Sequence, residues 1–312
     1  KISYKNLISE NYALVKDELG GIGYLDFDKF GNTPDAQQND LQNPNRIAGL
    51  NQRFKYNYYL FSKQLTAFLQ TVFNYKKIDF FMAANFMKTT HQREGIYENG
   101  SFPGSLSLGK SEQAVFNTFS LKGGATYKIT GRHFIKFNAG SFLKPPSTKN
   151  TYSNVRENNK LVEGLENEKN IVADLSYLFR GTKINLKLTG YYASITNATK
   201  ISFFYADGIA GNGSENTAFV QEILTNIDKK HLGVEWGFEM KLTPSLQLHI
   251  AGNIGEYVYA NNPDLQLTSD NFLDTFRFKK TSYLKNYKLS NGPQTAYTIG
   301  FEYRDAKYWW LA

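Results

Sequence analysis

Five short turns alternate with four long polar segments along this chain, and that alternation constrains the fold more than any other feature. The turns lie at residues 76–78, 130–132, 181–183, 243–245 and 304–306, and each joins two stretches in which apolar and polar residues alternate. The long segments are Gln92–Glu112, Leu143–Glu168, Thr199–Gln221 and Tyr259–Gln294. A period of two indicates β-strands, so the chain is a series of hairpins. Short turns join the strands at one end, and long segments join them at the other. This arrangement is typical of an antiparallel transmembrane β-barrel with short periplasmic turns and long extracellular loops.

The segment His231–Thr243 has the clearest alternation. Its apolar side carries Leu232, Trp236 and Met240, its polar side carries His231, Glu235, Glu239 and Lys241, and the polar side of the next strand carries His249. A lysine facing lipid near mid-bilayer would cost about 2–4 kcal/mol, whereas a wet lumen accepts it easily. We therefore expect the polar set to face the lumen. A soluble sheet with one solvated face alternates in the same way, but long strands and asymmetric connections favour the membrane.

Composition excludes several other classes of protein. No stretch approaches ~18 consecutive apolar residues, which excludes a transmembrane helix but not barrel strands of about 9–11 residues. The chain has no cysteine, so a thiol nucleophile and a cysteine-bound metal are ruled out. Its four histidines form no metal-binding motif, and no catalytic or cofactor motif occurs, so we expect no enzyme activity, metal or cofactor. The net charge of +8 is spread without a basic block, so we do not expect nucleic acid as a partner.

About ten strands follow one another without an intervening helical pattern, with an eleventh expected around Phe54–Phe61. Residues 1–53 are polar, and we expect a loop or lead-in segment there. Residues 54–312 then form a partial transmembrane β-barrel. The last residues, Trp309-Trp310-Leu311-Ala312, resemble the start of a strand, so we expect the chain to be part of a longer protein.

Several short motifs resemble those of the TonB-dependent receptors of Bacteroidetes-type bacteria. They are Tyr127–His133, Asn154–Asn159, Tyr257–Pro263, Gly292-Pro293-Gln294 and Phe301–Trp310, and the resemblance covers roughly residues 50–312. It implies a barrel of about 22 strands whose lumen is filled by a plug. No segment of this chain matches the plug, the TonB-contacting segment or the closing strands of that family. The chain would therefore be a middle-to-late part of the barrel.

Two segments of the long loops are our candidates for ligand contact, because they combine rings, charges and amides that suit a polar ligand such as a glycan or peptide. The candidate residues are Arg156, Asn158, Asn159, Phe204, Tyr205 and Asp207. Around the last short turn, aromatic residues gather in a way that suits the headgroup zone of a membrane. These interfacial-girdle candidates are Tyr303, Tyr308, Trp309 and Trp310.

The resemblance implies a nutrient importer of the Gram-negative outer membrane, in which extracellular loops capture the ligand and TonB supplies energy. The partners it implies are the TonB complex, through parts outside this chain, and outer-membrane lipid or lipopolysaccharide. Whether a surface lipoprotein is also a partner stays open. Two alternatives stay open. One is a barrel that serves as a scaffold for protein secretion or surface lipoprotein assembly, and the other is a soluble all-β binding protein.

Overall fold

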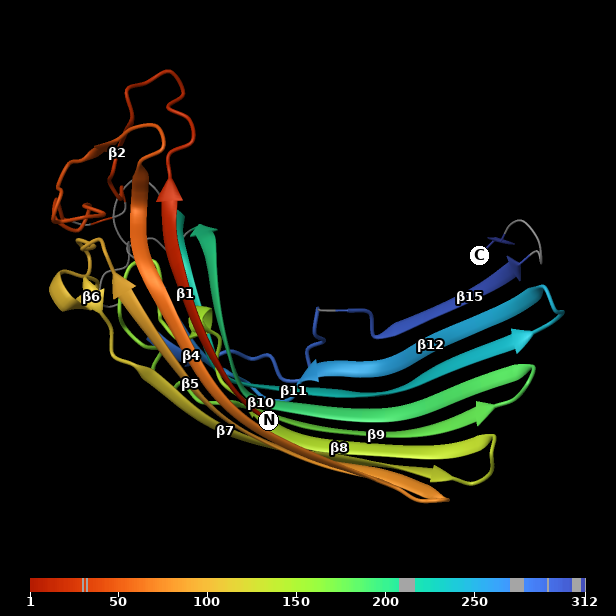
Figure 1. Ribbon diagram of the computed structural model, residues 1–312. Coiled ribbons are helices and arrows are strands. Elements are labelled where there is room, and N and C mark those ends of the chain that lie inside the picture. The colour runs from red at the N-terminus through yellow and green to blue at the C-terminus, as the bar shows by residue number, and fades with distance from the viewer. Residues whose placement is uncertain are drawn as a thin grey trace.

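The computed structural model of the chain describes residues 1–29, 31, 33–207, 217–269, 278–290, 292–304 and 310–311. Within them the chain forms one large antiparallel sheet in which consecutive long strands are neighbours (Figure 1). The strands of its main path are β1 (Ile2–Leu14), β4 (Arg53–Asn74), β5 (Ile78–Gly95), β7 (Ala114–Lys128), β8 (His133–Lys144), β9 (Glu168–Arg180), β10 (Ile184–Asp207), β11 (Thr217–Lys241), β12 (Leu246–Tyr259), β15 (Thr295–Arg304) and β16 (Trp310–Leu311). The predicted all-β antiparallel architecture is confirmed.

Several short strands and 3₁₀ turns lie on the loop side of this sheet. The short strands are β2 (Tyr24–Leu25), β3 (Ile47–Ala48), β6 (Gly109–Lys110), β13 (Asp264–Ser269) and β14 (Phe278–Thr281), and the two 3₁₀ turns are η1 (Gly104–Leu106) and η2 (Thr148–Asn150). Among the residues that the structure describes, no helix is long and apolar enough to cross a membrane.

The sheet is curved, and its short turns and long connections lie at opposite ends of the strands (Figure 1). Four of the predicted turns are confirmed, since three or four residues separate β4 from β5, β7 from β8, β9 from β10 and β11 from β12. The fifth predicted turn, at 304–306, lies mostly outside the described residues. Within the described part β1 and β16 are the two ends of the strand order.

The register separates apolar from polar side chains across eight strands. Directly paired residues share a face, and one cross-strand row consists of Ile78, Tyr127, Ile135, Tyr177, Leu188, Trp236, Gly252 and Tyr297. The next row, on the opposite face, consists of Asp79, Thr126, Lys136, Ser176, Thr189, Glu235, Asn253 and Ala296. We call these two sides the apolar face and the polar face.

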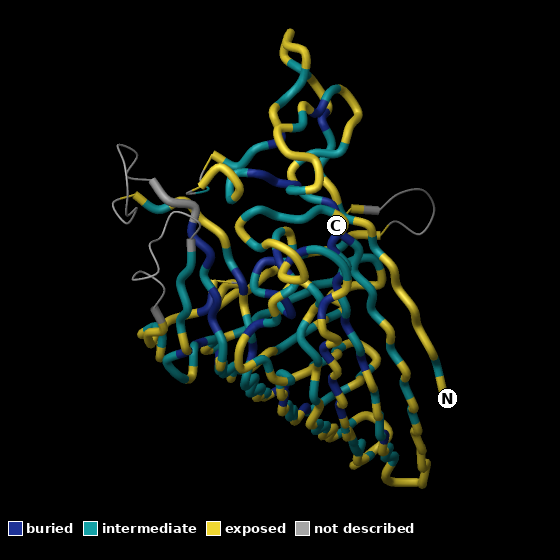
Figure 2. The backbone as a smooth tube through the Cα atoms, turned by 90° about the vertical axis from the view of Figure 1, so that its left-hand side faces the viewer, coloured by how far each residue is buried: buried dark blue, intermediate teal, exposed yellow. Residues whose placement is uncertain are grey.

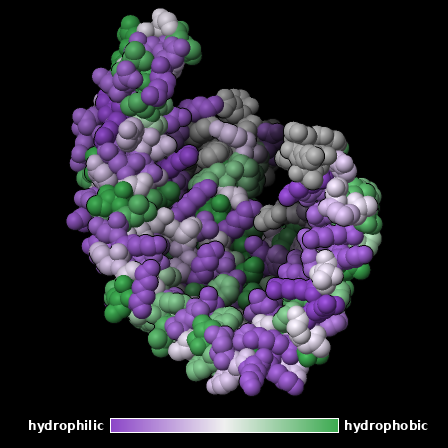
Figure 3. All heavy atoms as spheres, turned by 45° about the vertical axis from the view of Figure 1, so that its right-hand side comes forward, coloured by the Kyte–Doolittle hydropathy of each residue, from purple (hydrophilic) through white to green (hydrophobic). Residues whose placement is uncertain are grey.

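At the neighbouring residues Leu188 and Thr189, exposure is the reverse of that in a water-soluble sheet. Leu188 on the apolar face is 45% exposed, whereas its neighbour Thr189 on the polar face is 5% exposed and its hydroxyl pairs with that of Ser176 at 2.9 Å. Hydrophilic side chains line much of the hollow of the curved sheet (Figure 3). A sheet with an exposed apolar side and polar side chains in its hollow fits a lipid-facing wall.

Buried residues gather in the loop half of the molecule, while the strands near the turns are mostly half-buried or exposed (Figure 2). One small apolar cluster joins Val162, from the connection between β8 and β9, to Ile201 on β10 and Ile223 on β11. A second consists of Ala198, Leu224 and Ile227. Packing between loops and strand ends therefore takes the place of a central core.

The expectation that Thr199–Gln221 is a loop is wrong for its described residues. β10 continues to Asp207 and β11 begins at Thr217, and the two pair throughout that range. The alternation is hidden because the register shifts around Ala198, where Asn197 and Asn226 have positive φ. Each bulge changes which face a residue occupies, so a period of two cannot be followed through it. The predicted loop Gln92–Glu112 likewise contains the end of β5, and Tyr259–Gln294 contains β13 and β14.

Residues 1–53 include a strand that the sequence pattern did not identify. β1 pairs with β4 from Ile2↔Ala67 to Leu14↔Arg53. As an end strand of the described sheet it has one neighbour, and polar residues such as Asn6 stand among its apolar ones. Residues 15–52, which we call the N-terminal loop, then fold back over the loop side of the sheet (Figure 1).

Candidate functional site

Three connections meet on the loop side of the polar face, and we call them together the cap. They are the N-terminal loop, residues 96–113 and residues 145–167. The main-chain N–H of Leu41 donates to the oxygen of Glu98 at 2.8 Å, and that of Asn159 donates to the oxygen of Leu106 at 2.7 Å. The cap rests on the polar face because His91 on β5 contacts the carbonyl oxygen of Pro146 at 3.2 Å. Segments far apart in the sequence thus form one body.

A cavity of about 600 Å³ lies between the cap and the strands β4 and β10. Its volume is within the range of small-molecule binding sites. The rings of Phe27, Phe54, Tyr56 and Tyr205 and the cationic side chains of Lys29, Lys55 and Arg156 line it. Rings with a few charged groups are the usual composition of a site that fixes the orientation of a polar ligand.

A bulge in β4 places Lys55 in this cavity. Pairing with β1 shifts between Tyr12 and Ala13, so that residues 55 and 56 have no partner on β1. Lys55 has φ of +65°, a left-handed conformation that costs a residue with a Cβ about 1 kcal/mol or more. The main-chain N–H of Lys55 donates to the carboxylate of Asp26 at 2.9 Å. This bond holds the bulge in place.

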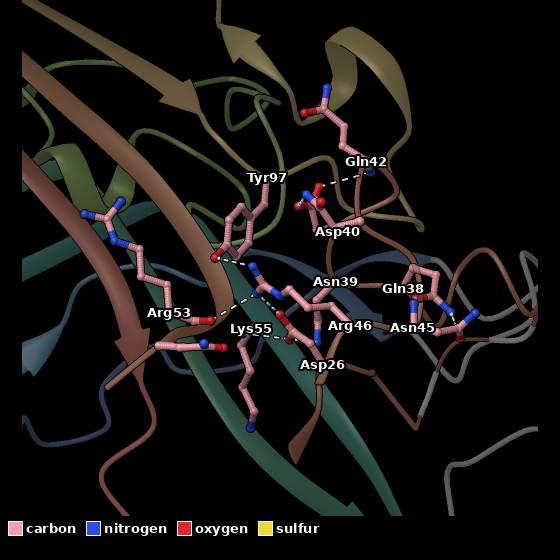
Figure 4. A network of polar contacts seen from close by, with 12 residues as sticks. Asp26, Gln38, Asn39, Asp40, Gln42, Asn45, Arg46, Arg53, Lys55 and Tyr97 are labelled. Carbon is pink, nitrogen blue, oxygen red and sulfur yellow. Dashed lines mark hydrogen bonds and ion pairs between the residues drawn. The ribbon is translucent and has the colours of Figure 1, made fainter. Parts of the chain in front are cut away.

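Asp26 is the centre of a buried polar network in the N-terminal loop (Figure 4). Its carboxylate also accepts a hydrogen bond from the Nδ2 of Asn39 at 2.9 Å and forms an ion pair with the guanidinium of Arg46. Arg46 in turn donates to the hydroxyl of Tyr97 at 2.9 Å and to the main-chain oxygen of Arg53 at 3.0 Å. The side chain of Lys55 extends away from this network (Figure 4). The N-terminal loop therefore supports the backbone of the bulge through Asp26 and Arg46.

Three rings of β4 each have a cation over them. The Nζ of Lys55 is 5.4 Å from the ring centroid of Phe54, the Cζ of Arg156 is 5.2 Å from that of Tyr56, and the Cζ of Arg93 is 5.1 Å from that of Tyr58. Cations at these distances are attracted by the ring faces. The first two cations are exposed, whereas Arg93 is only 1% exposed.

Arg93 joins the cap to the sheet. Its guanidinium donates to the oxygens of Val155 at 2.8 Å, Ser107 at 2.8 Å and Arg156 at 3.3 Å, and to the Oδ1 of Asn159 at 2.6 Å. These acceptors come from two of the three cap segments. The buried charge is tolerated because the N–H groups of the guanidinium bind these acceptors and the guanidinium lies over the ring of Tyr58. Pattern-based reading of the sequence missed Arg93, which stands in a segment predicted to be a loop.

Tyr152 is the buried tyrosine of the cap. Its side chain is fully buried, and its hydroxyl lies 3.1 Å from the Oγ of Ser111. Burial raises the pKa of Tyr152, because a phenolate would lose its hydration there. The segments 145–167 and 96–113 are thus joined through a hydroxyl that is held in its neutral form.

Of the predicted ligand contacts, Arg156 and Tyr205 line the cavity. Asn158 and Asn159 do not, and their amides are used inside the cap. The Oδ1 of Asn158 accepts from Ser153 at 3.0 Å, and the Nδ2 of Asn159 donates to the oxygen of Ser105 at 3.0 Å. Phe204 and Asp207 lie with Tyr205 on the end of β10, paired with β11, rather than in a loop. Of the six predicted residues, the structure therefore brings Arg156 and Tyr205 together in one cavity.

The five predicted lumen residues share the polar face, since Glu235 belongs to the polar row and the others follow at even spacing or by direct pairing. His249 lies between two carboxylates, with its Nδ1 3.9 Å from Glu239 and its Nε2 3.6 Å from Glu302. His231 stands eight residues from Glu239 along β11 and pairs with Tyr257. Because His249 pairs with Glu239, His231 and His249 are about 27 Å apart. Among the described residues no group of His, Asp and Glu could hold a metal ion. Lys241 pairs with Gln247 near the turn.

Of the girdle candidates, Tyr303 pairs with Leu246 and Leu311 at the turn end of the sheet. Tyr308 and Trp309 lie outside the described residues. Trp310 begins β16, where its backbone pairs with Arg304. The girdle thus stays a prediction.

A second hollow, of about 640 Å³, lies on the apolar face. Leu69, Met82, Leu121 and Ile171 surround its small residues Gly123 and Ala139. It is a dent in the exposed apolar wall, remote from the cap. The candidate site is therefore the cavity under the cap.

No known family and no curated protein matches the sequence. Among solved structures, the chain is similar to the ferric yersiniabactin uptake receptor FyuA of Yersinia pestis, with 14% identity and a TM-score of 0.45 over 79% of this chain and 38% of that one. It is also similar to the copper transporter OprC, with 12% identity and a TM-score of 0.38 over 80% of this chain and 49% of the other. A third similar structure is the siderophore receptor PirA of Acinetobacter baumannii, with 9% identity and a TM-score of 0.33 over 98% of this chain and 54% of the other.

The chain thus spans at most 54% of the length of these three proteins. Likeness at these identities and TM-scores does not establish a function. The functional conclusion has to come from the geometry of the sheet and its cap.

Proposed function

We propose that this chain is part of the barrel wall of a TonB-dependent nutrient importer in the outer membrane. The carrying observation is the two-sided register, with an apolar row facing one way and a polar row the other across eight strands. In hydrocarbon a sheet must close so that every backbone group is paired, and further strands of the whole protein would supply that closure. The polar face then lines the lumen.

The cap supports import rather than a role as a passive scaffold. Two of its segments, the N-terminal loop and residues 145–167, enclose a cavity at the loop end of the polar face together with β4 and β10, where an extracellular ligand would arrive first. The hydrogen bonds of Arg93 and Asp26 fix the walls of this cavity before any ligand binds, so binding needs little ordering of the loops. The ligand would be captured there and passed down the lumen when TonB displaces the plug.

Single-cysteine labelling tests the orientation. The chain has no cysteine, so Lys149→Cys in the cap and Lys76→Cys in the first short turn each add one thiol. We expect a membrane-impermeant maleimide to label Lys149→Cys on intact cells and Lys76→Cys only after the outer membrane is opened. Equal labelling of both on intact cells, or of neither before cell lysis, would contradict the proposed wall.

Import itself is tested by depletion of nutrients from the medium. Strains that lack this gene, or lack TonB, are grown on a mixture of glycans and peptides, and the compounds left are measured by mass spectrometry. We expect the same compound to persist with both deletions. If nothing persists, while surface lipoproteins are lost from the gene-deletion strain, the scaffold role would replace the importer.

A further inference from the structure

We propose that the cavity under the cap takes an organic anion, in which a carboxylate is attached to a ring whose face can stack on an aromatic side chain. The inference rests on the proposed function, because it names the class of ligand that the importer captures. Two sources share this chemistry, an acidic oligosaccharide built from uronic acids and an aromatic carboxylic acid. The argument has three steps.

The first step is that two cations face the cavity without an anionic partner. Lys55 and Arg156 are exposed, and each charged group lies over a ring, of Phe54 and Tyr56 respectively. Among the described residues, neither the ammonium of Lys55 nor the guanidinium of Arg156 has a carboxylate within 4.0 Å. The other charged lining residues, Asp28, Lys29 and Glu157, interact with other residues. The charge left toward a ligand is therefore positive.

The second step is a comparison of two arginines that lie over neighbouring rings of β4. Arg93 is buried, and its donors are used by four acceptors of the cap. Arg156 lies over its ring at nearly the same distance, yet its guanidinium makes no hydrogen bond to the described residues. An exposed guanidinium with its fork of donors beside a cavity suits a carboxylate, which it can bind through two parallel hydrogen bonds.

The third step concerns Lys55. A left-handed conformation favours glycine or asparagine, and here it carries a lysine whose N–H is held by the buried Asp26. The strained bulge has the effect of moving this ammonium out of the strand alternation and into the cavity. The rings of Phe27, Phe54, Tyr56 and Tyr205 then offer flat apolar surfaces beside two positive charges. A ring that carries a carboxylate satisfies both features at once.

Calorimetric titration of the purified full-length protein in detergent tests the proposal with three probes. Trigalacturonate is the acidic oligosaccharide, maltotriose is its neutral counterpart of equal ring number, and 4-hydroxybenzoate is the aromatic acid. We expect at least one acid to bind, maltotriose to bind at least tenfold more weakly than that acid, and the binding of the acid to weaken with added salt. Binding of one acid alone identifies the source of the carboxylate.

Variants locate the site. Lys55→Met and Arg156→Met should each weaken binding of the acid at least tenfold, and Arg156→Lys should fall between Arg156→Met and the parent because it keeps the charge but loses the fork. Lys149→Met removes an exposed lysine from the same cap and should change nothing. Hydrogen exchange of the cap should be the same in all four variants, which separates lost recognition from lost folding.

The proposal is overturned if no acid binds, if maltotriose binds as tightly as the acid that binds, or if both methionine variants bind the acid as the parent does. Binding in detergent needs neither TonB nor an energised membrane. A failed titration with intact nutrient uptake therefore overturns only the ligand class, and intact binding with no uptake overturns only the importer.

Discussion

Arg93 donates a hydrogen bond through its Nη2 to the main-chain oxygen of Arg156, at 3.3 Å. The buried arginine thereby holds the backbone of the exposed one beside the cavity. Because Arg93 also binds the oxygens of Ser107 and Val155, one side chain fixes two cap segments relative to β5. The recognition proposed for Arg156 would thus depend on a residue that does not line the cavity.

Arg93→Met should loosen the cap while leaving the sheet intact. The change leaves buried acceptors of residues 107, 155 and 159 without donors, which we expect to lower the local stability by about 3 kcal/mol or more. Hydrogen exchange in residues 100–110 and 150–160 should become faster, while β9 stays protected. Arg156→Met is the matched control, because its guanidinium holds no cap segment. Equal exchange in both variants would mean that Arg93 does not anchor the cap.

Asp26→Asn should release the N-terminal loop and the bulge that it supports. The substitution keeps the shape but removes the charge that binds Arg46 and accepts from the N–H of Lys55. Hydrogen bonds to charged groups contribute about 1.5–3 kcal/mol each, so we expect a local loss of about 2–3 kcal/mol. Limited proteolysis of residues 15–52 should become faster. Asp35→Asn, at an exposed site in the same loop, is the control and should leave the rate of proteolysis unchanged. An unchanged rate in Asp26→Asn would mean that the network does not hold the loop.

Much of the sheet could be predicted from the sequence, because a strand without a bulge carries its own two-residue period. His231–Thr243 has no bulge, so Leu232 and Glu235 could be assigned to opposite faces without knowledge of their partners. The extension of β10 beyond Ala198 could not, since bulges at Asn197 and Asn226 interrupt the period.

The cavity was only partly predictable, because its walls come from segments distant in sequence. Arg156 and Tyr205 stood out as a charge and a ring in polar surroundings, but Lys55 and Arg93 lay in segments that alternation assigned to a strand and a loop. Their roles depend on Asp26 and on residues 155–159, which reach them only in the folded chain. Long-range contacts of this kind leave no periodic signal.

Tyr152→Phe should make the cap less sensitive to alkaline pH. Burial raises the pKa of Tyr152 above the ordinary value of 10, so its neutral form stabilises the cap fully below pH 10. This contribution is lost as the pH rises through the raised pKa, because the unfolded tyrosine ionises more readily. Phenylalanine removes that dependence but also the contact with Ser111, at a cost of about 1 kcal/mol at neutral pH.

Subtilisin cleavage of residues 145–167 between pH 8 and 11 measures this effect. Cleavage of the parent should accelerate above pH 10 more steeply than that of Tyr152→Phe. Tyr4→Phe, on the exposed strand β1, serves as the control and should follow the parent. Identical profiles for the parent and Tyr152→Phe would contradict a role for Tyr152 in the alkaline response.

A pair of arginine substitutions at adjacent positions of β11 tests which face meets lipid. Val234 belongs to the apolar face and is 43% exposed, whereas Glu235 belongs to the polar row and is also exposed. Val234→Arg should cost about 2–4 kcal/mol in the membrane, because the guanidinium loses its hydration in hydrocarbon. Glu235→Arg should cost far less, since a wet lumen keeps the charge hydrated. Urea titration of the whole protein folded in lipid vesicles, followed by gel mobility, gives both values. In a water-soluble sheet both arginines would be solvated and their costs would be similar, so equal costs would remove the membrane from the interpretation.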